Sequence, residues 1–464
     1  MIVGKAKDCL DIVGGKLLQG SATKLFRGVS INSRTIEEEE LFVCIQGEKF
    51  DGHNFLGEAI NKGAAGVILS DPSHLSENMT SEGNSPFVIQ SQNTLRALQE
   101  LAGYQRTQFP FQVVAVTGTN GKSTTKEMIA SIIGTKYNTL KTQGNLNNHI
   151  GLPLTLLARK PEHEVGVLEM GMSAAGEIKR LAEIAKPEIG VVTNISEGHL
   201  VHLKTLKKVQ AAKGELFDSL SEKETAIVNA DDPLVLELAK SVRAKVITYG
   251  IYKGADIKAE NICPMDREGF KLSVNFSGKN IPMCIPFLGE CNIYNALAAI
   301  ATSWSLGVAP DDIKQGLMAA KLLANRFEVS EHRGVTIIND SYNANPRSMK
   351  EALKILAKYK CKGRRFFIVG EMLELGDLSK PAHKALGVDV AKYSIDYLVT
   401  VGDLSSHVAK SAVASGMNKK NTTIASGHEC AVAFIKKHSR SGDCLLVKGS
   451  RGSKMEEVVR RFVA

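Results

Sequence analysis

The stretch Val113-Val-Ala-Val-Thr-Gly-Thr-Asn-Gly-Lys-Ser123 decides how the centre of this chain folds. An apolar, β-branched run ends in a turn with two glycines, and the Lys-Ser pair then opens a helix predicted over residues 122–134. Glycines let backbone N–H groups approach phosphates closely, and the N-terminus of a helix adds partial positive charge. Lys122 is placed to reach the terminal phosphates, and the Ser123 hydroxyl is placed to ligate Mg²⁺. This order of elements predicts a site for a nucleoside triphosphate.

One position departs from the general phosphate-loop pattern. The pattern has a glycine five residues before Gly121, and this chain has Val116 there. A plain strand-to-helix connection is the simpler alternative for such a turn. We favour phosphate binding because the strand, both glycines, the lysine and the serine are all present and in order.

Length and composition are those of a globular enzyme with several domains. The chain has 464 residues, of which 43% are hydrophobic and 23% charged, and this length suggests roughly three domains. No apolar run approaches the roughly 18 residues that cross a bilayer, and residues 1–20 contain Asp8 and Asp11 without a signal-peptide core. We therefore expect no stable membrane association, and we also expect the protein to be a cytoplasmic monomer.

The charge and the cysteines narrow the class of function further. The formal net charge is +9, but the Lys and Arg residues are dispersed rather than gathered in a stripe. Small anionic substrates account for this excess, so we expect no nucleic-acid partner. The eight cysteines show no Cys-x-x-Cys spacing, which favours reduced thiols over a zinc site or a disulfide framework.

The apolar pattern predicts an α/β protein with three domains, at residues 1–109, 110–325 and 326–464. The first is an α/β module whose polar run 71–85 reads as an exposed loop. The second alternates strands and helices, which predicts a mostly parallel sheet covered on both faces, with a small antiparallel excursion near 256–286. The third restarts this rhythm and is predicted to be dinucleotide-fold-like.

The individual elements are predicted from the same periodicities. Strands are predicted at 41–45, 66–69, 87–89, 165–170, 189–195, 225–229, 245–249, 335–340, 365–370, 397–402 and 444–449. Helices are predicted at 54–61, 94–104, 174–185, 206–220, 348–359, 380–392 and 452–462.

Two ionisable residues follow strands at the edge where ligands gather in open α/β sheets. Glu169 ends one predicted strand, and His199 comes just after another. A carboxylate and an imidazole near a phosphate loop could ligate Mg²⁺, although this ion prefers oxygen. The alternatives are a solvated glutamate and a histidine that caps a helix, and position alone leaves them even.

Other polar residues have simpler readings on their own. Lys213 lies on a predicted helix and reads as an ordinary exposed lysine. The amides of the segment 144–151 could donate to phosphate or acyl oxygens, but stabilising turns is the safer reading. In the third domain, Ser348 reads as a helix N-cap and Pro346 as the residue that begins the helix.

Together, these segments resemble the Mur ligase family, ATP-dependent amide-forming enzymes of peptidoglycan synthesis. The resemblance covers essentially the whole chain, and Val116 is normal for the family's phosphate loop. The branch that adds D-alanyl-D-alanine to UDP-N-acetylmuramoyl-tripeptide is the most similar, and the Asp-Asn-Pro-Arg of the tripeptide-forming branch is absent. The matching motifs are Thr117-Gly-Thr-Asn-Gly-Lys-Ser-Thr-Thr-Lys-Glu127, Gly144-Asn-Leu-Asn-Asn-His-Ile-Gly-Leu-Pro153, Glu169-Met-Gly-Met172, Asn339-Asp-Ser-Tyr-Asn-Ala-Asn-Pro346, Gly370-Glu-Met-Leu-Glu-Leu-Gly376 and Lys448-Gly-Ser-Arg451.

The resemblance implies a role for individual residues. The phosphate loop would bind ATP through Thr117, Gly118, Thr119, Asn120, Gly121, Lys122, Ser123 and Thr124, and the rest of the nucleotide would contact Asn292, Asn295, Arg326 and Asp340. Mg²⁺ would be held by Ser123, Glu169, His199 and a carbamylated Lys213. The catalytic set would be Lys122, Asn148, His199 and Lys213, and the UDP-sugar would contact Ser33, Arg34, Asp51 and His53.

Two positions depart from the family. Its N-terminal Asp-Ser-Arg is Asn32-Ser-Arg34 here, which puts position 32 in doubt. Its Gly-x-His-Asn is Gly289-Glu-Cys-Asn292, and Cys291 cannot reproduce an imidazole hydrogen bond. A folylpolyglutamate-synthase-type ligase, which lacks the uridine-binding module, and a non-catalytic nucleotide-binding protein are the alternative functions.

Overall fold

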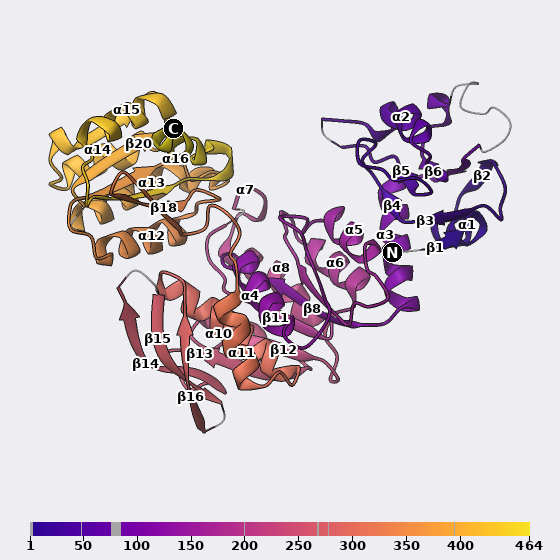
Figure 1. Cartoon of the computed structure of the whole chain (residues 1–464), viewed down its shortest axis with the longest axis horizontal. Helices are drawn as coiled ribbons and strands as arrows, with labels where there is room; N and C mark the ends of the chain where they lie inside the picture. The colour runs from indigo at the N-terminus through magenta and orange to yellow at the C-terminus, as the bar shows by residue number, and fades with distance from the viewer. Residues whose placement is uncertain are drawn as a thin grey trace.

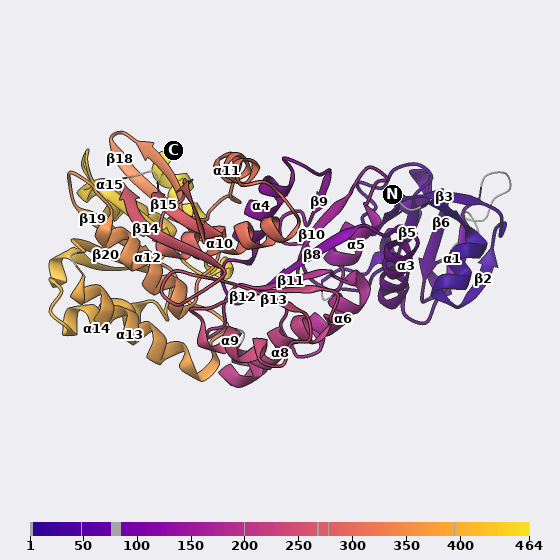
Figure 2. The same ribbon diagram turned by 90° about the horizontal axis from the view of Figure 1, so that it is seen from below.

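The computed structural model describes residues 3–47, 49–75, 85–198, 200–266, 269–276, 278–393 and 395–464. The molecule is elongated, and its parts follow one another in chain order, as Figures 1 and 2 show. The N-terminal part lies at one end, the C-terminal part at the other, and the largest sheet lies between them. The α/β fold class predicted from the sequence is confirmed.

The N-terminal part contains a five-stranded sheet in the order β2-β7-β6-β5-β4. Its strands are parallel except for β2, which pairs antiparallel with β7. A separate pair, β1 and β3, lies beside it. The elements are β1 (Val3–Lys5), α1 (Ala6–Val13), β2 (Lys16–Gln19), β3 (Leu25–Arg27), β4 (Val29–Ser30), β5 (Leu41–Val43), η1 (Gly52–Phe55), α2 (Leu56–Asn61), β6 (Gly66–Leu69) and β7 (Phe87–Gln90).

The central sheet has nine strands in the order β16-β15-β14-β13-β12-β11-β8-β10-β9. Strands β8 to β14 are parallel, whereas β14, β15 and β16 form the predicted antiparallel excursion. The strands are β8 (Gln112–Thr117), β9 (Thr139–Lys141), β10 (Val165–Glu169), β11 (Ile189–Val192), β12 (Thr225–Asn229), β13 (Lys245–Gly250), β14 (Ile257–Met265), β15 (Gly269–Phe276) and β16 (Lys279–Ile285).

Helices cover both faces of the central sheet, because its inner strands carry apolar side chains on both faces. Val113 and Ala115 of β8 face one apolar cluster, and Val114 and Val116 face the other. The first cluster is covered by α3 (Thr94–Gln108), α5 (Gly151–Leu157), α6 (Glu177–Ala185), α8 (Leu206–Asp218) and α9 (Pro233–Ala239), and the second by α4 (Lys122–Ile133), α10 (Glu290–Ser305) and α11 (Pro310–Ala319). A short helix, α7 (Leu200–Leu203), precedes α8.

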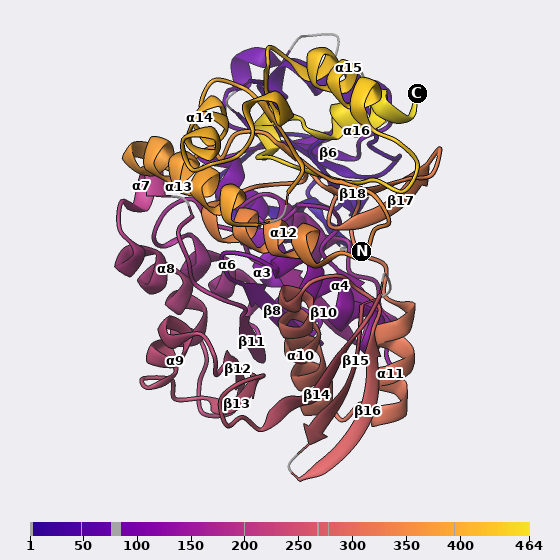
Figure 3. The ribbon, with the colours of Figure 1, turned by 90° about the vertical axis from the view of Figure 1, so that its left-hand side faces the viewer.

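The C-terminal part is a six-stranded sheet in the order β17-β18-β22-β19-β20-β21, parallel except at β17. Figure 3 shows α12 on the side of this part that faces the central sheet. The elements are β17 (Glu328–His332), β18 (Val335–Asp340), α12 (Pro346–Lys358), β19 (Arg365–Val369), α13 (Ser379–Lys392), β20 (Tyr397–Val401), α14 (Ser406–Ala414), β21 (Thr422–Ala425), α15 (His428–His438), β22 (Cys444–Lys448) and α16 (Glu456–Val463).

Most predicted elements exist, and the differences concern their ends. The strand predicted at 189–195 stops at Val192, because beyond Thr193 the backbone leaves the ladder: Asn194 O accepts from Thr119 N of the phosphate loop, and Ile195 N donates to Asp232 Oδ2. The helix predicted at 54–61 begins as a 3₁₀ turn capped by Asp51. The helix predicted from residue 348 begins at Pro346, and Asn345 is its N-cap, so Ser348 was the wrong cap.

The structure describes only part of the predicted loop 71–85. Of the polar run predicted as a loop, residues 76–84 lie outside the described residues, and Pro72–His74 forms a 3₁₀ turn.

Within the described ranges, none of the helices combines the length and apolar character needed to cross a bilayer.

Candidate active site

The phosphate loop connects β8 to α4, and its two glycines are there for a steric reason. Gly118 and Gly121 have φ angles of +144° and +83°, which L side chains rarely adopt. A Cβ on Gly118 would lie 1.9 Å from Thr193 Oγ1, and one on Gly121 would lie 2.3 Å from Asn295 Oδ1. The loop therefore packs closely between Thr193, the residue after β11, and Asn295 of α10. The N-terminus of α4 faces the cleft described below.

Two lysines converge on one carbonyl of this loop. Lys122 Nζ donates to Gly118 O at 3.0 Å and to Thr119 O at 3.3 Å, and Lys213 Nζ donates to the same Gly118 O at 2.9 Å. Burial lowers the pKa of Lys122, and it lowers the pKa of Lys213 well below its usual value, with the nearby Lys122 charge adding to the latter shift.

The reading of Lys213 as an exposed helix lysine was wrong. Its side chain is 1% exposed, because α8 packs against the face of the sheet that includes β8 and β11. A buried amine with a depressed pKa has a larger neutral fraction at physiological pH than an exposed lysine. Neutral amines are nucleophilic, so the environment suits a modified or reactive lysine.

Glu169 lies at the carboxyl end of β10 and is 2% exposed. Its Oε1 accepts a hydrogen bond from Asn147 Nδ2 at 2.7 Å. Its Oε2 is buried and has no hydrogen-bond partner in the part of the chain that the structure describes. An unpartnered buried carboxylate oxygen is costly unless a cation or donor occupies the space before it. The reading of Glu169 as a solvated residue at a strand end was wrong.

These donors fit a magnesium ion. Glu169 offers a free carboxylate oxygen, and the Ser123 hydroxyl at the first turn of α4 also lines the cleft. Oxygen donors of this kind are the ones that Mg²⁺ prefers. His199, the remaining unmodified residue of the predicted set, lies outside the described residues.

A cleft of about 720 Å³ lies in front of the phosphate loop and is lined by both the central and the C-terminal parts. Most residues predicted to bind nucleotide or to act in catalysis meet there. They are Thr119, Asn120, Gly121, Lys122, Ser123, Thr124, Asn148, Glu169, Asn292, Asn295, Arg326 and Asp340. Thr117 is fully buried behind the loop, where its hydroxyl donates to Met170 O at 2.8 Å.

Two asparagines at the start of α10 form the wall of the cleft beside the phosphate loop. Asn292 Nδ2 donates to Leu288 O at 2.8 Å, and Asn295 Nδ2 donates to Asn292 Oδ1 at 2.9 Å. Cys291, directly before Asn292, also lines the cleft, and burial raises the pKa of its thiol to about 12. Where the family has a histidine imidazole, this chain therefore has the neutral thiol of Cys291.

The opposite wall belongs to the C-terminal part. Asp340, at the end of β18, accepts from Lys448 Nζ at 2.6 Å, and both side chains are buried. Burial raises the pKa of Asp340, and the Lys448 charge opposes that shift. Arg326 stacks over the ring of Tyr342 at 4.1 Å and donates to Ser123 Oγ at 3.2 Å. A cation of the C-terminal part thus lies against the phosphate loop.

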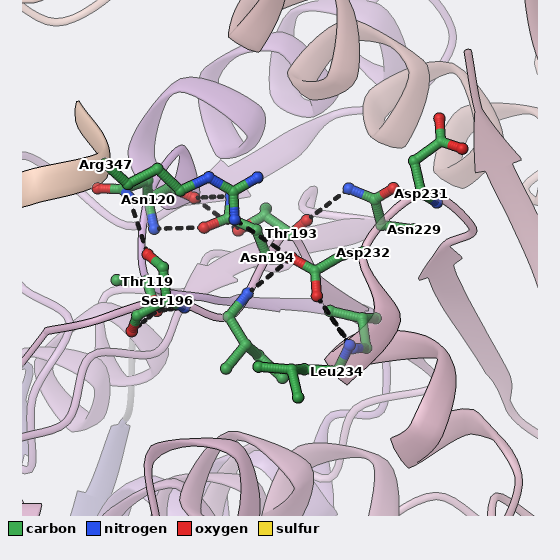
Figure 4. A network of polar contacts seen from close by, with 12 residues as sticks. Thr119, Asn120, Thr193, Asn194, Ser196, Asn229, Asp231, Asp232, Leu234 and Arg347 are labelled. Carbon is green, nitrogen blue, oxygen red and sulfur yellow. Dashed lines mark hydrogen bonds and ion pairs between the residues drawn. The ribbon is translucent and has the colours of Figure 1, made fainter. Parts of the chain in front are cut away.

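A polar network joins the two walls, as Figure 4 shows. Asn120 Oδ1 accepts from Asn345 Nδ2, the N-cap of α12, at 2.7 Å. Arg347 Nη1, in the first turn of the same helix, approaches Asp232 Oδ2 at 3.4 Å. Asp232 also accepts from the backbone of Ile195 at 3.2 Å, directly after β11. Local sequence patterns do not predict these contacts, because the residues that form them are 37 to 225 positions apart.

The predicted sugar-binding residues lie in the N-terminal part and do not line this cleft. Ser33 is buried and donates to Glu58 Oε2 at 2.6 Å. His53 is also buried, with Nδ1 2.6 Å from Asp51 Oδ1 and Nε2 accepting from the backbone of Ser70 at 3.0 Å. Internal partners therefore engage three of these side chains, whereas Arg34 is exposed.

Asn148 also has an internal partner set. Its Oδ1 accepts from the backbone of Ile150 at 3.1 Å and of Gly151 at 2.9 Å, where α5 begins. This is the turn-stabilising role that its residue type favours. The neighbour that reaches Glu169 is Asn147, which was not assigned to the catalytic set.

Comparisons with known proteins agree over the whole chain. Residues 25–112 match the model for the Mur ligase family catalytic domain, residues 116–303 the Mur ligase middle domain, and residues 325–451 the Mur ligase glutamate ligase domain. UDP-N-acetylmuramoyl-tripeptide–D-alanyl-D-alanine ligase of Bacillus subtilis is 36% identical, covering 100% of this chain and 99% of the relative.

Two solved structures are similar throughout. MurF from Acinetobacter baumannii has a TM-score of 0.89 at 29% identity, covering 100% of this chain and 99% of that one. MurF ligase from Thermotoga maritima, solved in complex with ADP, has a TM-score of 0.81 at 27% identity, covering 94% and 97%. With its sequence matched from end to end and its fold shared, the chain belongs to the Mur ligase family.

Proposed function

We propose that this protein uses ATP to join D-alanyl-D-alanine to the carboxylate of UDP-N-acetylmuramoyl-tripeptide, releasing ADP and phosphate. The observation that carries the proposal is the cleft, in which the phosphate loop faces Arg326, Asp340 and Lys448 of the C-terminal part. The chain with this cleft matches two UDP-N-acetylmuramoyl-tripeptide–D-alanyl-D-alanine ligases over 99% and 96% of their length.

The chemistry explains why ATP is needed. A carboxylate is a poor electrophile, and an amine beside it mainly forms a salt pair. Transfer of the γ-phosphoryl group to a carboxylate oxygen gives an acyl phosphate, whose phosphate is a good leaving group. The neutral amine of the dipeptide then attacks the carbonyl carbon, phosphate leaves, and the amine loses a proton. The negative charge on the transferring group develops next to the phosphate loop, where Lys122 stabilises it.

We assign the metal site to Ser123, Glu169 and His199, with Lys213 as a carbamate. Bound Mg²⁺ would neutralise phosphate charge during phosphoryl transfer. The buried amine of Lys213, whose pKa burial lowers, would attack carbon dioxide in its neutral form, forming an N–C bond and losing one N–H proton. This reaction converts a cation that would repel the metal into an anion that attracts it.

The three parts of the chain would hold different substrates. Residues 1–109 would bind the uridine nucleotide, residues 110–325 would bind ATP, and residues 326–464 would close over the reacting groups. The support for this division is that each part has its own sheet and that the cleft lies between the second and third. Closure would exclude water that otherwise hydrolyses the acyl phosphate. The cytoplasmic location and monomeric state stay predictions.

Phosphate release tests this function against its alternatives. The protein is incubated with ATP, Mg²⁺ and UDP-N-acetylmuramoyl-tripeptide, with and without D-alanyl-D-alanine. We expect release that depends on both substrates and a product whose mass equals their sum less water. Turnover with a pterin-glutamate substrate in their place would favour a folylpolyglutamate-synthase-type ligase. Nucleotide binding without turnover on any substrate would favour a non-catalytic protein.

Rescue of one variant tests the carbamate. Lys213→Ala should lose most activity, and acetate or bicarbonate should restore part of it by placing a carboxylate in the vacated space. Lys213→Arg should stay inactive, because a guanidinium keeps its positive charge. Lys122→Ala is the matched control, because a carboxylate cannot replace its cation. A fully active Lys213→Ala would exclude the carbamate.

A further inference from the structure

The loop between β9 and α5 brings an amide against the carboxylate that we assign to the metal site. Asn147 Nδ2 donates to Glu169 Oε1 at 2.7 Å, and the other oxygen, Oε2, is buried without a hydrogen-bond partner among the described residues. A carboxylate accepts bonds on both oxygens, so a donor held against one of them restricts rotation of the group and the direction of the other.

The segment that carries Glu169 holds this loop at two points. At its start, Thr142 N donates to Val167 O at 3.1 Å, and the Glu169 N–H donates to Thr142 Oγ1 at 3.0 Å. At Asn147, the backbone carbonyl accepts from Gly171 N at 2.8 Å. The loop is thus bonded to β10 at Thr142 and, at Asn147 itself, to Gly171 two residues beyond Glu169, which limits how far the Asn147 amide can move.

Two further features make the fit close. A Cβ on Gly171 would lie 2.8 Å from Asn147 Oδ1, so only glycine leaves room for the amide there. Lys126 is fully buried in α4, and its Nζ donates to Thr142 O at 2.6 Å. Because α4 begins at the phosphate loop, this bond sets the start of the Asn147 loop relative to the phosphate site.

We propose that Asn147 is a positioning residue that holds the Glu169 carboxylate so that Oε2 alone faces the metal. Without this donor, the carboxylate could rotate and would offer the metal a less fixed ligand. Partners behind metal ligands typically change metal affinity 10- to 100-fold when they are removed. The inference depends on the proposed metal role of Glu169, so its test includes a variant for that role.

Direct metal binding is the measurement, with Mn²⁺ as the probe. The full-length protein is saturated with the non-hydrolysable ATP analogue AMPPCP, and free Mn²⁺ is followed by electron paramagnetic resonance during titration. Asn147→Ala and the near-isosteric Asn147→Leu should each weaken Mn²⁺ binding about 10-fold. Gln143→Ala, an exposed amide of the same loop that does not line the cleft, should bind Mn²⁺ as the unchanged protein does.

Glu169→Gln separates the two hypotheses. If it binds Mn²⁺ as tightly as the unchanged protein, the proposed metal role of Glu169 is wrong. If it binds weakly while both folded Asn147 variants bind normally, Glu169 is a ligand and the positioning role of Asn147 is wrong. A lowered melting temperature with unchanged Mn²⁺ affinity would mean that Asn147 only stabilises the loop. Asn147→Leu keeps the test decisive if Asn147→Ala does not fold.

Discussion

The central sheet meets its two neighbours through joints of opposite chemistry. On the N-terminal side, Leu98 and Leu101 of α3 are fully buried in the same apolar cluster as Leu152 of α5 and Ile178 of α6. Arg106, near the end of α3, also donates to the carbonyl of Ala185 at 2.7 Å. One continuous core thus crosses this joint.

On the C-terminal side the contacts are mainly polar. The sheet there has its own two apolar clusters, and Leu288 and Phe327 pack at the margin of one of them. The two walls of the cleft meet through the pairs Asn120–Asn345, Asp232–Arg347 and Ser123–Arg326.

The difference indicates which joint can open. Separating an apolar core exposes surface that water solvates poorly, whereas polar pairs can exchange each other for water at little net cost. The N-terminal part should therefore move with the central sheet, while the C-terminal part can open to admit substrates and close to exclude water. An enzyme that forms an acyl phosphate needs both states.

The largest expected effect is a break in the N-terminal joint. Leu101→Ala should lower the free energy of unfolding by about 2–5 kcal/mol, because it leaves a cavity in a shared core. Tyr104→Ala, on the same helix but 41% exposed, should cost far less. Urea unfolding followed by circular dichroism measures both. Independent transitions for the N-terminal and central parts would contradict a continuous core.

The second-largest effect is expected in the cleft, where a substitution should lower the rate of catalysis and leave the fold and both joints unchanged. Lys122→Ala should lower kcat on the order of 10²-fold or more, because charge on the transferring phosphoryl group loses a stabilising cation. The melting temperature and circular dichroism spectrum serve as the check on folding. Lys136→Ala, just beyond the same helix and bonded to Gly307 O, should keep normal activity. A folded Lys122→Ala with near-normal turnover would exclude this role.

Breaking the polar joint should lower the free energy of unfolding only slightly but should change the overall dimensions of the protein. Arg347→Ala removes the partner of Asp232, an ion pair whose arginine is 45% exposed, so the free energy of unfolding should fall by about 1 kcal/mol or less. X-ray scattering should show a larger radius of gyration with the nucleotide analogue bound, together with a lower kcat/KM. Lys350→Ala, which breaks a pair with Asp389 inside the C-terminal part, is the control. Unchanged scattering and activity would argue against a joint that opens.

The smallest effect concerns the pH dependence of stability. Burial lowers the pKa of Lys213 below its usual 10.5 in the folded protein, so the unfolded chain binds more protons at pH values between the lowered pKa and 10.5. The stability penalty of this group therefore shrinks as pH rises toward 10.5. In buffer free of carbon dioxide, Lys213→Met should gain stability over the unchanged protein at pH 7 and gain less at pH 9. Lys207→Met, exposed on the same helix, should show no such trend.

Local patterns carried much of the fold and part of the cleft. Short apolar runs predicted the ends of most strands to within a few residues. The phosphate-loop motif correctly predicted Lys122 and Ser123 at the start of α4. Motif resemblance also brought Asn292, Asn295, Arg326 and Asp340 to the same cleft. Element ends were missed where a backbone group bonds to a distant segment, as after Val192.

The sequence by itself determined the fold class, the phosphate loop and the family, because each depends on residues that are close together in the chain. Only the tertiary structure decided that Lys213 is buried beside Lys122, that Asn147 rather than Asn148 reaches Glu169, and that the two joints differ. Burial and hydrogen bonding depend on which distant segments meet. Local periodicity carries no information about those contacts.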